Sequence, residues 1–81
     1  MRKLIIISAV WCPSCLLLNK EIKNIKNDFD IEIEKLDYDL DDIEKYNVGN
    51  TLPVIILEEN NIEIKRLTGE KSYNEIKEFL K

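Results

Sequence analysis

The stretch WCPSC, residues 11–15, contains both cysteines of this 81-residue chain, separated by two residues. An apolar run, residues 4–7, precedes it, and apolar residues at helical spacing follow it. A Cys-x-x-Cys pair at the junction of a strand and a helix can close and open a small disulfide ring. The pair therefore predicts a protein that transfers electrons between thiols and disulfides.

Cys12 is expected to cap the helix that follows, where unpaired backbone N–H groups favour a thiolate over a thiol. Because the thiolate is the attacking species in disulfide exchange, Cys12 is the predicted nucleophile. Cys15 lies one helical turn further on, so we expect it to be more buried and to resolve the mixed disulfide. Trp11 is either a plain core residue or, as we predict, part of a docking surface beside the thiolate.

The cysteine pair has three other interpretations. A structural disulfide across so short a loop would add little stability to a cytoplasmic protein. A zinc site needs four ligands, and a chain with two cysteines and no histidine would need a second chain to supply the others. Two unrelated core cysteines are the third interpretation. Redox chemistry accounts best for the spacing, so we predict no metal.

The hydrophobic pattern divides the chain into four strands and three helices. After Ile33 the apolar residues change parity, which indicates either a bulge near Lys35 or a strand covered on both faces. Ser72 and Glu75 form a predicted capping box for the last helix. The predicted strands are residues 3–9, 31–38, 54–57 and 62–67, joined by a hairpin turn at 58–61, and the first two helices are residues 13–27 and 40–46.

The element order is therefore β-α-β-α-β-β-α, in a single α/β domain over residues 1–81. The first β-α-β unit should be parallel with a right-handed crossover, and the last two strands should form an antiparallel hairpin. Together these connections predict a four-stranded mixed sheet.

The net charge is −4, and no basic patch stands out, so nucleic acid is excluded as a predicted partner. Acidic residues gather before and within the predicted helix at 40–46. They form either a solvated helix start or a docking patch for a basic partner. The residues concerned are Asp37, Asp39, Asp41, Asp42 and Glu44.

Residues 1–10 imitate a short signal peptide, with basic residues before an apolar run. The run is at the short end for such a segment, and Trp11 stands where a cleavage site needs a small residue. We therefore expect a buried strand here, and no segment is long enough to span a membrane. The prediction is a cytoplasmic monomer, in a compartment where a lone Cys-x-x-Cys pair is more often catalytic than structural.

With this order and this motif, the chain resembles the thioredoxin superfamily, in a small form near glutaredoxin without the extra N-terminal strand and helix of full thioredoxins. The resemblance covers nearly the whole chain and rests on WCPSC, on Thr51-Leu52-Pro53 and on Gly69 before the last helix. It implies a minimal thioredoxin fold with helices on both faces of the sheet. It also implies a cis Pro53 facing the cysteines, whereas a trans proline starting an edge strand is the alternative.

By the same resemblance, the Leu52 backbone pairs with a substrate strand or glutathione, and Trp11, Pro13 and Pro53 shape the groove. Trp11 and the tail at residues 66–70 are thioredoxin-like, whereas Pro13, the segment at 51–53 and the short length are glutaredoxin-like.

Three positions depart from these families, and a fourth, Lys35, agrees with one of them. Ile6 stands where thioredoxins carry a buried Asp, whereas Lys35 falls where they keep a Lys, or is simply an exposed strand residue. Glu70 follows the single Gly69 where glutaredoxins have a Gly-Gly pair, and Ser14 replaces their aromatic residue. These departures argue against a dedicated glutathione site.

The predicted function is the reduction of protein disulfides by dithiol exchange through Cys12 and Cys15. The resemblance implies that a flavoenzyme of the thioredoxin reductase type, or glutathione, supplies the electrons, with no cofactor bound to the chain. A glutathione-dependent glutaredoxin is one alternative. A non-catalytic redox sensor or adaptor on the same fold is the other.

Overall fold

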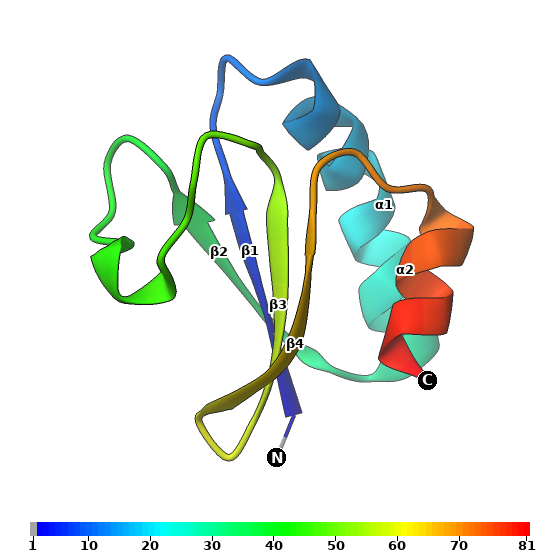
Figure 1. Ribbon diagram of the computed structural model, residues 1–81. Coiled ribbons are helices and arrows are strands. Elements are labelled where there is room, and N and C mark those ends of the chain that lie inside the picture. The colour runs from blue at the N-terminus through cyan, green and yellow to red at the C-terminus, as the bar shows by residue number, and fades with distance from the viewer. Residues whose placement is uncertain (1) are drawn as a thin grey trace.

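The computed structural model describes residues 2–81, whose four strands form one mixed sheet in the order β2-β1-β3-β4 (Figure 1). Strand β1 pairs with β2 in parallel and with β3 antiparallel, and β3 pairs antiparallel with β4. The α/β class and the predicted strand pairing are confirmed. The elements are β1 (Arg2–Ser8), α1 (Pro13–Phe29), β2 (Glu32–Asp37), η1 (Glu44–Tyr46), β3 (Val54–Glu59), β4 (Ile62–Thr68) and α2 (Tyr73–Leu80).

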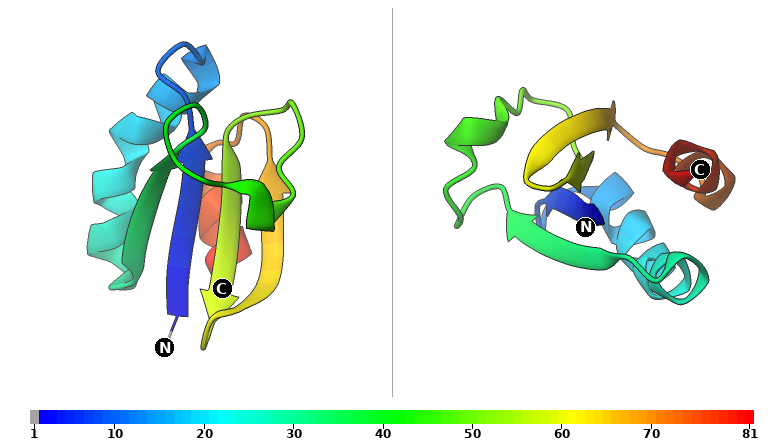
Figure 2. Two further views of the ribbon diagram at one scale, coloured as in Figure 1. Left: turned by 90° about the vertical axis from the view of Figure 1, so that its left-hand side faces the viewer. Right: turned by 90° about the horizontal axis from the view of Figure 1, so that it is seen from below.

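Helices α1 and α2 lie side by side on one face of the sheet (Figure 1, Figure 2). Alternate residues of a strand point to opposite faces, so Leu4 and Ile6 of β1 meet the helices. We call the cluster on this side the helix-face core. Its buried members are Leu4, Ile6, Leu18, Ile25, Ile31, Ile55, Leu57, Ile76, Phe79 and Leu80.

The other face of the sheet is covered by the segment between β2 and β3, which contains η1 (Figure 2). Ile5 and Ile7 of β1 point to this side, where Tyr46 packs over the sheet. We call this second cluster the loop-face core. Its buried members are Ile5, Ile7, Ala9, Cys12, Cys15, Tyr46, Leu52, Val54 and Ile56.

The predicted helix at residues 40–46 is wrong, because only Glu44–Tyr46 form a single turn of 3-10 helix. The side chain of Asp37 accepts hydrogen bonds from the backbone N–H groups of Asp39 and Leu40. Asp41 in turn accepts one from the backbone N–H of Asp37. Aspartate side chains that satisfy nearby backbone groups compete with helix formation, so an irregular loop with one 3-10 turn covers this face instead of an α-helix.

The parity change in β2 comes from burial on both faces. The β1–β2 register runs without interruption from Lys3 opposite Glu32 to Ser8 opposite Asp37, so no bulge intervenes. Ile33 packs against the helix-face core, whereas Leu36 packs against the loop-face core. Between the two explanations left open by the sequence, the strand covered on both faces is correct.

Local signals set the ends of the regular elements. Ser72 and Glu75 form the predicted capping box at the start of α2. Asn60 and Asn61 both have positive φ angles, of 53° and 68°, at the hairpin turn between β3 and β4, as a two-residue turn of this kind requires.

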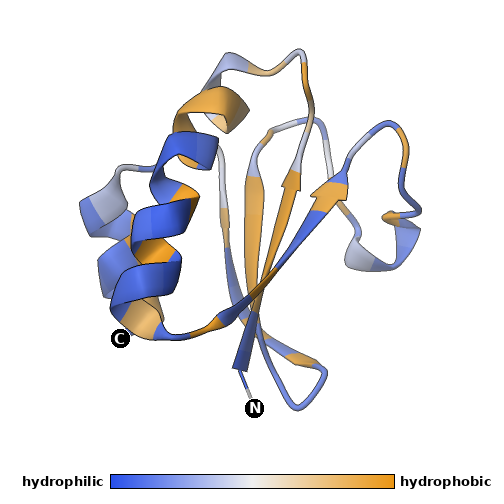
Figure 3. Ribbon diagram, turned by 180° about the vertical axis from the view of Figure 1, so that it is seen from behind, coloured by the Kyte–Doolittle hydropathy of each residue, from blue (hydrophilic) through white to orange (hydrophobic). Residues whose placement is uncertain are grey.

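Helix α1 runs to Phe29, slightly beyond its predicted end. Its first turns are hydrophobic, whereas its later turns carry mostly hydrophilic residues (Figure 3).

Within residues 2–81, no helix combines the length and the apolar character needed to cross a membrane.

Candidate functional site

Cys12 occupies the N-terminal end of α1, as the position of the motif predicted. Strand β1 ends at Ser8, and the N–H of Cys12 donates to the carbonyl of Ala9 at 3.2 Å, which closes a tight turn before the helix. Cys12 has extended backbone angles, and its Sγ accepts the backbone N–H of Cys15 at 3.2 Å. The sulfur is therefore the helix cap, where the orphan N–H groups and the helix dipole favour negative charge.

The two cysteines differ in access. Both are free thiols, with Cys12 6% exposed and Cys15 completely buried. Burial, followed by the hydrogen bond with Cys12, raises the pKa of the Cys15 thiol to about 11. Of the two cysteines, only Cys12 therefore keeps any exposure to solvent, and Cys15 stays a thiol at neutral pH.

The segment with Leu52 and Pro53 lies directly beside Cys12, although 40 residues separate Leu52 from it in the chain. The Sγ–H of Cys12 donates to the carbonyl of Leu52 across 3.8 Å. The Leu52–Pro53 peptide bond is cis, and the carbonyl of Pro53 accepts the N–H of Gly69 at 2.9 Å. Gly69 has a φ angle of 90°, which favours glycine at this position.

Trp11 is 59% exposed, so it is not a core residue. Its indole Nε1–H donates to Oδ2 of Asp39 at 2.7 Å, and its ring meets that of Tyr38 edge to face, with 6.3 Å between the centroids. Asp39 follows β2, which lies beside β1 in the sheet. The sequence analysis placed Asp39 in an acidic group but missed its contact with Trp11.

On the other side of Cys12, the motif contacts the loop that leads into α2. Ser14 donates from its hydroxyl to Oε1 of Glu70 at 2.9 Å, across 56 residues of chain. Pro13 is the first residue of α1 and is exposed, and Val10 is 79% exposed beside the motif. The surroundings of Cys12 thus combine apolar side chains with two carboxylates, one on each side.

Ile6 and Lys35 are paired across β1 and β2 but differ in burial. Ile6 is completely buried in the helix-face core, whereas Lys35 is exposed, as expected of an ordinary strand residue. Among residues 2–81, no polar or charged side chain is buried, so no carboxylate lies next to Cys15 in the interior. These residues also bring together no group of three His, Cys, Asp or Glu side chains that could hold a metal ion.

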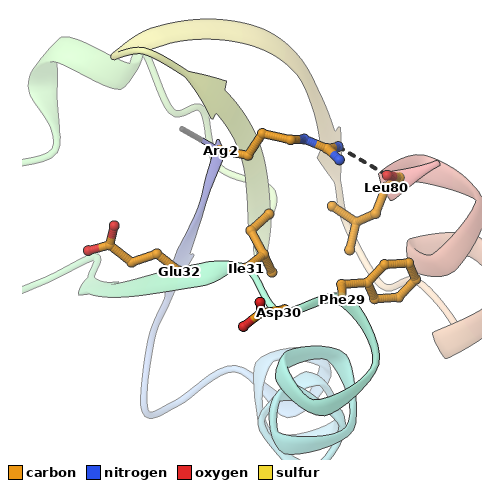
Figure 4. Close-up of a pocket in the computed structure, with 6 residues that line it drawn as sticks. All are labelled: Arg2, Phe29, Asp30, Ile31, Glu32 and Leu80. Atoms are coloured by element: carbon orange, nitrogen blue, oxygen red, sulfur yellow. Dashed lines mark hydrogen bonds between the residues drawn. The ribbon is translucent and has the colours of Figure 1, made fainter.

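A pocket of ≈ 290 Å³ lies at the opposite end of the sheet and takes no part in this site (Figure 4). Arg2 reaches across it, and its guanidinium donates to the carbonyl of Leu80 at 3.0 Å. This bond attaches the start of β1 to the end of α2. The residues that line the pocket are Arg2, Phe29, Asp30, Ile31, Glu32 and Leu80.

Solved structures of thioredoxins share the architecture. Thioredoxin from Fasciola hepatica is 20% identical, with a TM-score of 0.88, and the alignment covers 98% of this chain and 77% of that one. A mutant thioredoxin from Halobacterium salinarum is also 20% identical, with a TM-score of 0.90 and coverage of 98% and 71%. Trxlp from Edwardsiella tarda is 25% identical, with a TM-score of 0.85 and coverage of 98% and 81%. No curated protein matches the chain in sequence.

The family profile described as Thioredoxin matches residues 2–81, which is almost the whole chain. Its match agrees with the sheet order, with the cysteines three positions apart and with the structural likeness above. The chain therefore belongs to the thioredoxin family and is a thioredoxin-like redox protein.

Proposed function

We propose that this chain reduces disulfide bonds in other proteins by dithiol exchange, with Cys12 as the nucleophile and Cys15 as the resolving cysteine. The observation that carries the proposal is the pairing of the two sulfurs at the start of α1. One caps the helix and is 6% exposed, and the other lies completely buried one turn behind it. Only the first is accessible to a substrate, and only the second is close enough to finish the exchange.

In the first step, the Cys12 thiolate attacks one sulfur of the substrate disulfide, whose S–S bond breaks and whose second sulfur leaves as a thiolate. In the second step, the Cys15 thiol loses its proton and attacks the Cys12 sulfur. This forms the Cys12–Cys15 disulfide and releases the remaining substrate thiolate. Two electrons pass from the protein to the substrate, and the one proton released by Cys15 goes to solvent or to one of the substrate thiolates.

The position of Leu52 and Pro53 supports a role for their backbone in binding a substrate strand, because the Leu52 carbonyl lies 3.8 Å from the Cys12 sulfur. A substrate strand that approached Cys12 would meet the main chain of Leu52, and main-chain hydrogen bonds orient a peptide without demanding a particular sequence. Trp11 and Pro13 are exposed on either side of Cys12 and would supply apolar contact area.

The oxidised pair must be reduced again before another turnover. In this proposal a flavoenzyme of the thioredoxin reductase type, or glutathione, supplies the two electrons, and the chain itself binds no cofactor. The protein would then act as a monomer in the cytoplasm, where reducing donors keep thiols reduced.

The experiment that tests this proposal is insulin disulfide reduction with dithiothreitol as the donor. The wild-type protein is expected to accelerate the reaction, and the Cys12→Ser variant is expected to match the uncatalysed rate. Circular dichroism of both proteins controls for folding. Equal rates with and without wild-type protein would contradict a general reductase.

A redox sensor or adaptor is the second candidate, favoured by the interior around Cys15. Because no buried carboxylate can take its proton and its pKa is raised to about 11, the second exchange step is expected to be slow at neutral pH. Slow release of a mixed disulfide in stopped-flow experiments, together with partner binding in only one redox state, would favour this candidate over a reductase.

A further inference from the structure

Two side chains of the WCPSC stretch, one before Cys12 and one after it, each bind a surface carboxylate. Trp11 donates to Asp39 at 2.7 Å, and Ser14 donates to Glu70 at 2.9 Å. Asp39 comes from the loop after β2 and Glu70 from the loop after β4, so the two acids approach the motif from different loops. The loops after β1, β2 and β4 all lie at the same end of the sheet in Figure 1.

Both carboxylates are exposed, and each keeps one oxygen that the motif does not use. Neither forms an ion pair within residues 2–81, where the close pairs join Lys3 to Glu34, Arg66 to Glu63 and Lys81 to Glu78. Their negative charges are therefore available to an incoming substrate.

Carboxylates outnumber lysines in the two pockets that border the motif. Lys35 of β2 lines a pocket together with Val10 and the two carboxylates of Asp37 and Asp41. On the other side, Lys20 and Lys71 line a pocket together with three carboxylates, those of Glu21, Glu70 and Glu75. The surface around Cys12 therefore keeps a negative balance, in line with the net charge of the whole chain.

We propose that Asp39 and Glu70 determine substrate specificity, by selecting disulfides whose cysteines are flanked by Lys or Arg. The proposal rests on the reductase function above and names the substrate class of the same site. A substrate cysteine bound at Cys12 places its sequence neighbours over Trp11 on one side and Ser14 on the other. Basic neighbours would meet a carboxylate on each side, whereas acidic neighbours would be repelled.

Glutathione disulfide fits this surface poorly for the same reason. Each glutathione carries two carboxylates and one ammonium group, so it brings net negative charge to a negative site. A site with Glu70 at this position favours basic peptides over glutathione.

The expected effect is moderate, because exposed charges are screened by water and salt. Charge complementarity of this kind acts mainly on the rate of association. We expect a roughly three- to tenfold preference in the second-order rate constant of reduction at low ionic strength, falling below about twofold at high ionic strength.

The test uses three peptides with one intramolecular disulfide each, identical except for Lys, Gln or Glu beside the cysteines. Reduction by pre-reduced protein is followed in single turnover, at about 0.02 M and about 0.5 M salt. Each rate is divided by the rate with dithiothreitol alone, because flanking charges also change the reactivity of the disulfide itself.

The variants change charge without changing shape. Asp39→Asn and Glu70→Gln keep an oxygen that accepts the bond from Trp11 or Ser14, so the motif should stay in place. Glu59→Gln is the matched control, because Glu59 is exposed and lies at the other end of the sheet, where its position in β3 is opposite Arg2 of β1. It removes the same charge far from Cys12.

The proposal is supported if wild type and Glu59→Gln prefer the Lys peptide, and the Asp39→Asn, Glu70→Gln double variant does not. It is overturned if wild type reduces the three peptides at equal normalised rates, or if the double variant keeps the preference. If wild type reduces none of them faster than Cys12→Ser does, the reductase function fails and the specificity proposal fails with it. The neutral Gln peptide separates these two failures.

Discussion

Both faces of the sheet carry a buried apolar cluster, but the two clusters are built in different ways. In the helix-face core, α1 and α2 pack against Leu4 and Ile6. Every buried residue of this core except Ile31 belongs to a regular helix or strand. In the loop-face core, irregular backbone supplies Leu52 and much of the cover over Ile5 and Ile7, and both cysteines belong to it. One face is suited to stability, whereas the other brings distant loops to the reactive sulfur.

This contrast has a physical basis. Regular elements satisfy their own backbone groups and cover a sheet efficiently, but their side chains point in few directions. Loops need outside partners for their backbone and can present side chains and carbonyl groups at almost any angle. The contacts to Leu52, Asp39 and Glu70 that surround the motif all come from loops.

The largest expected effect is on the loop face, at Cys15. Replacing it in Cys15→Ser should leave the first exchange step intact and abolish the second, because no sulfur remains to attack the mixed disulfide. With an aromatic disulfide such as Ellman's reagent, wild type should release two thiolates per molecule. The variant should release one and keep the other group on Cys12, as seen by mass spectrometry. Two thiolates from the variant would contradict the role assigned to Cys15.

On the helix face, Ile25→Ala should reduce stability and leave chemistry unchanged. Ile25 is completely buried between α1 and the sheet, so truncation leaves a cavity and should cost about 2–5 kcal/mol of unfolding free energy. Leu17→Ala is the control on the same helix, because Leu17 is 51% exposed and should cost far less. Urea unfolding measures both, and insulin reduction is compared at a temperature where both variants are folded. A large loss of activity in folded Ile25→Ala would contradict the assignment of stability to the helix face and chemistry to the loop face.

The burial of Cys15 predicts a stability change at alkaline pH in the reduced protein. Its pKa is raised from 9.0 to about 11 on folding, so between these values the unfolded chain loses the proton while the folded chain keeps it. Stability therefore falls as pH rises through this window, by about 2 kcal/mol from this group. Lys and Tyr residues also titrate here, so the measurement is the difference between wild type and Cys15→Ala. An identical pH dependence in the two proteins would contradict the prediction.

The smallest expected effect concerns the turn on the loop face that the Asp37 side chain stabilises. Asp37→Ala removes the acceptor for the N–H groups of Asp39 and Leu40 and should cost about 1 kcal/mol. It should also shift the fluorescence of Trp11, the only tryptophan, because Asp39 holds its indole. Asp37→Asn keeps the acceptor oxygen and should change neither property. Equal effects of the two variants would show that the turn depends on charge rather than on these bonds.

The sequence predicted the elements of the helix-face core well. Apolar residues at helical spacing marked α1, the capping box at Ser72 marked the start of α2, and the turn before Ile62 marked the hairpin. These signals act between residues close in the chain, so they can be recognised without knowing the fold. The prediction of a helix at 40–46 failed because the side chains of Asp37 and Asp41 bind backbone N–H groups within residues 37–40 and stabilise an irregular turn there.

By itself the sequence determined the strand order along the chain, the helix that starts at the motif and the spacing of Cys12 and Cys15 over one helical turn. The family resemblance anticipated Leu52 and Pro53 beside the cysteines, but only the tertiary structure decided that Asp39 and Glu70 also contact the motif. Leu52, Asp39 and Glu70 lie 28 to 56 residues from their contacts near Cys12. Such contacts depend on which strands are neighbours in the sheet and where their loops end, and hydrophobic periodicity carries no information about either.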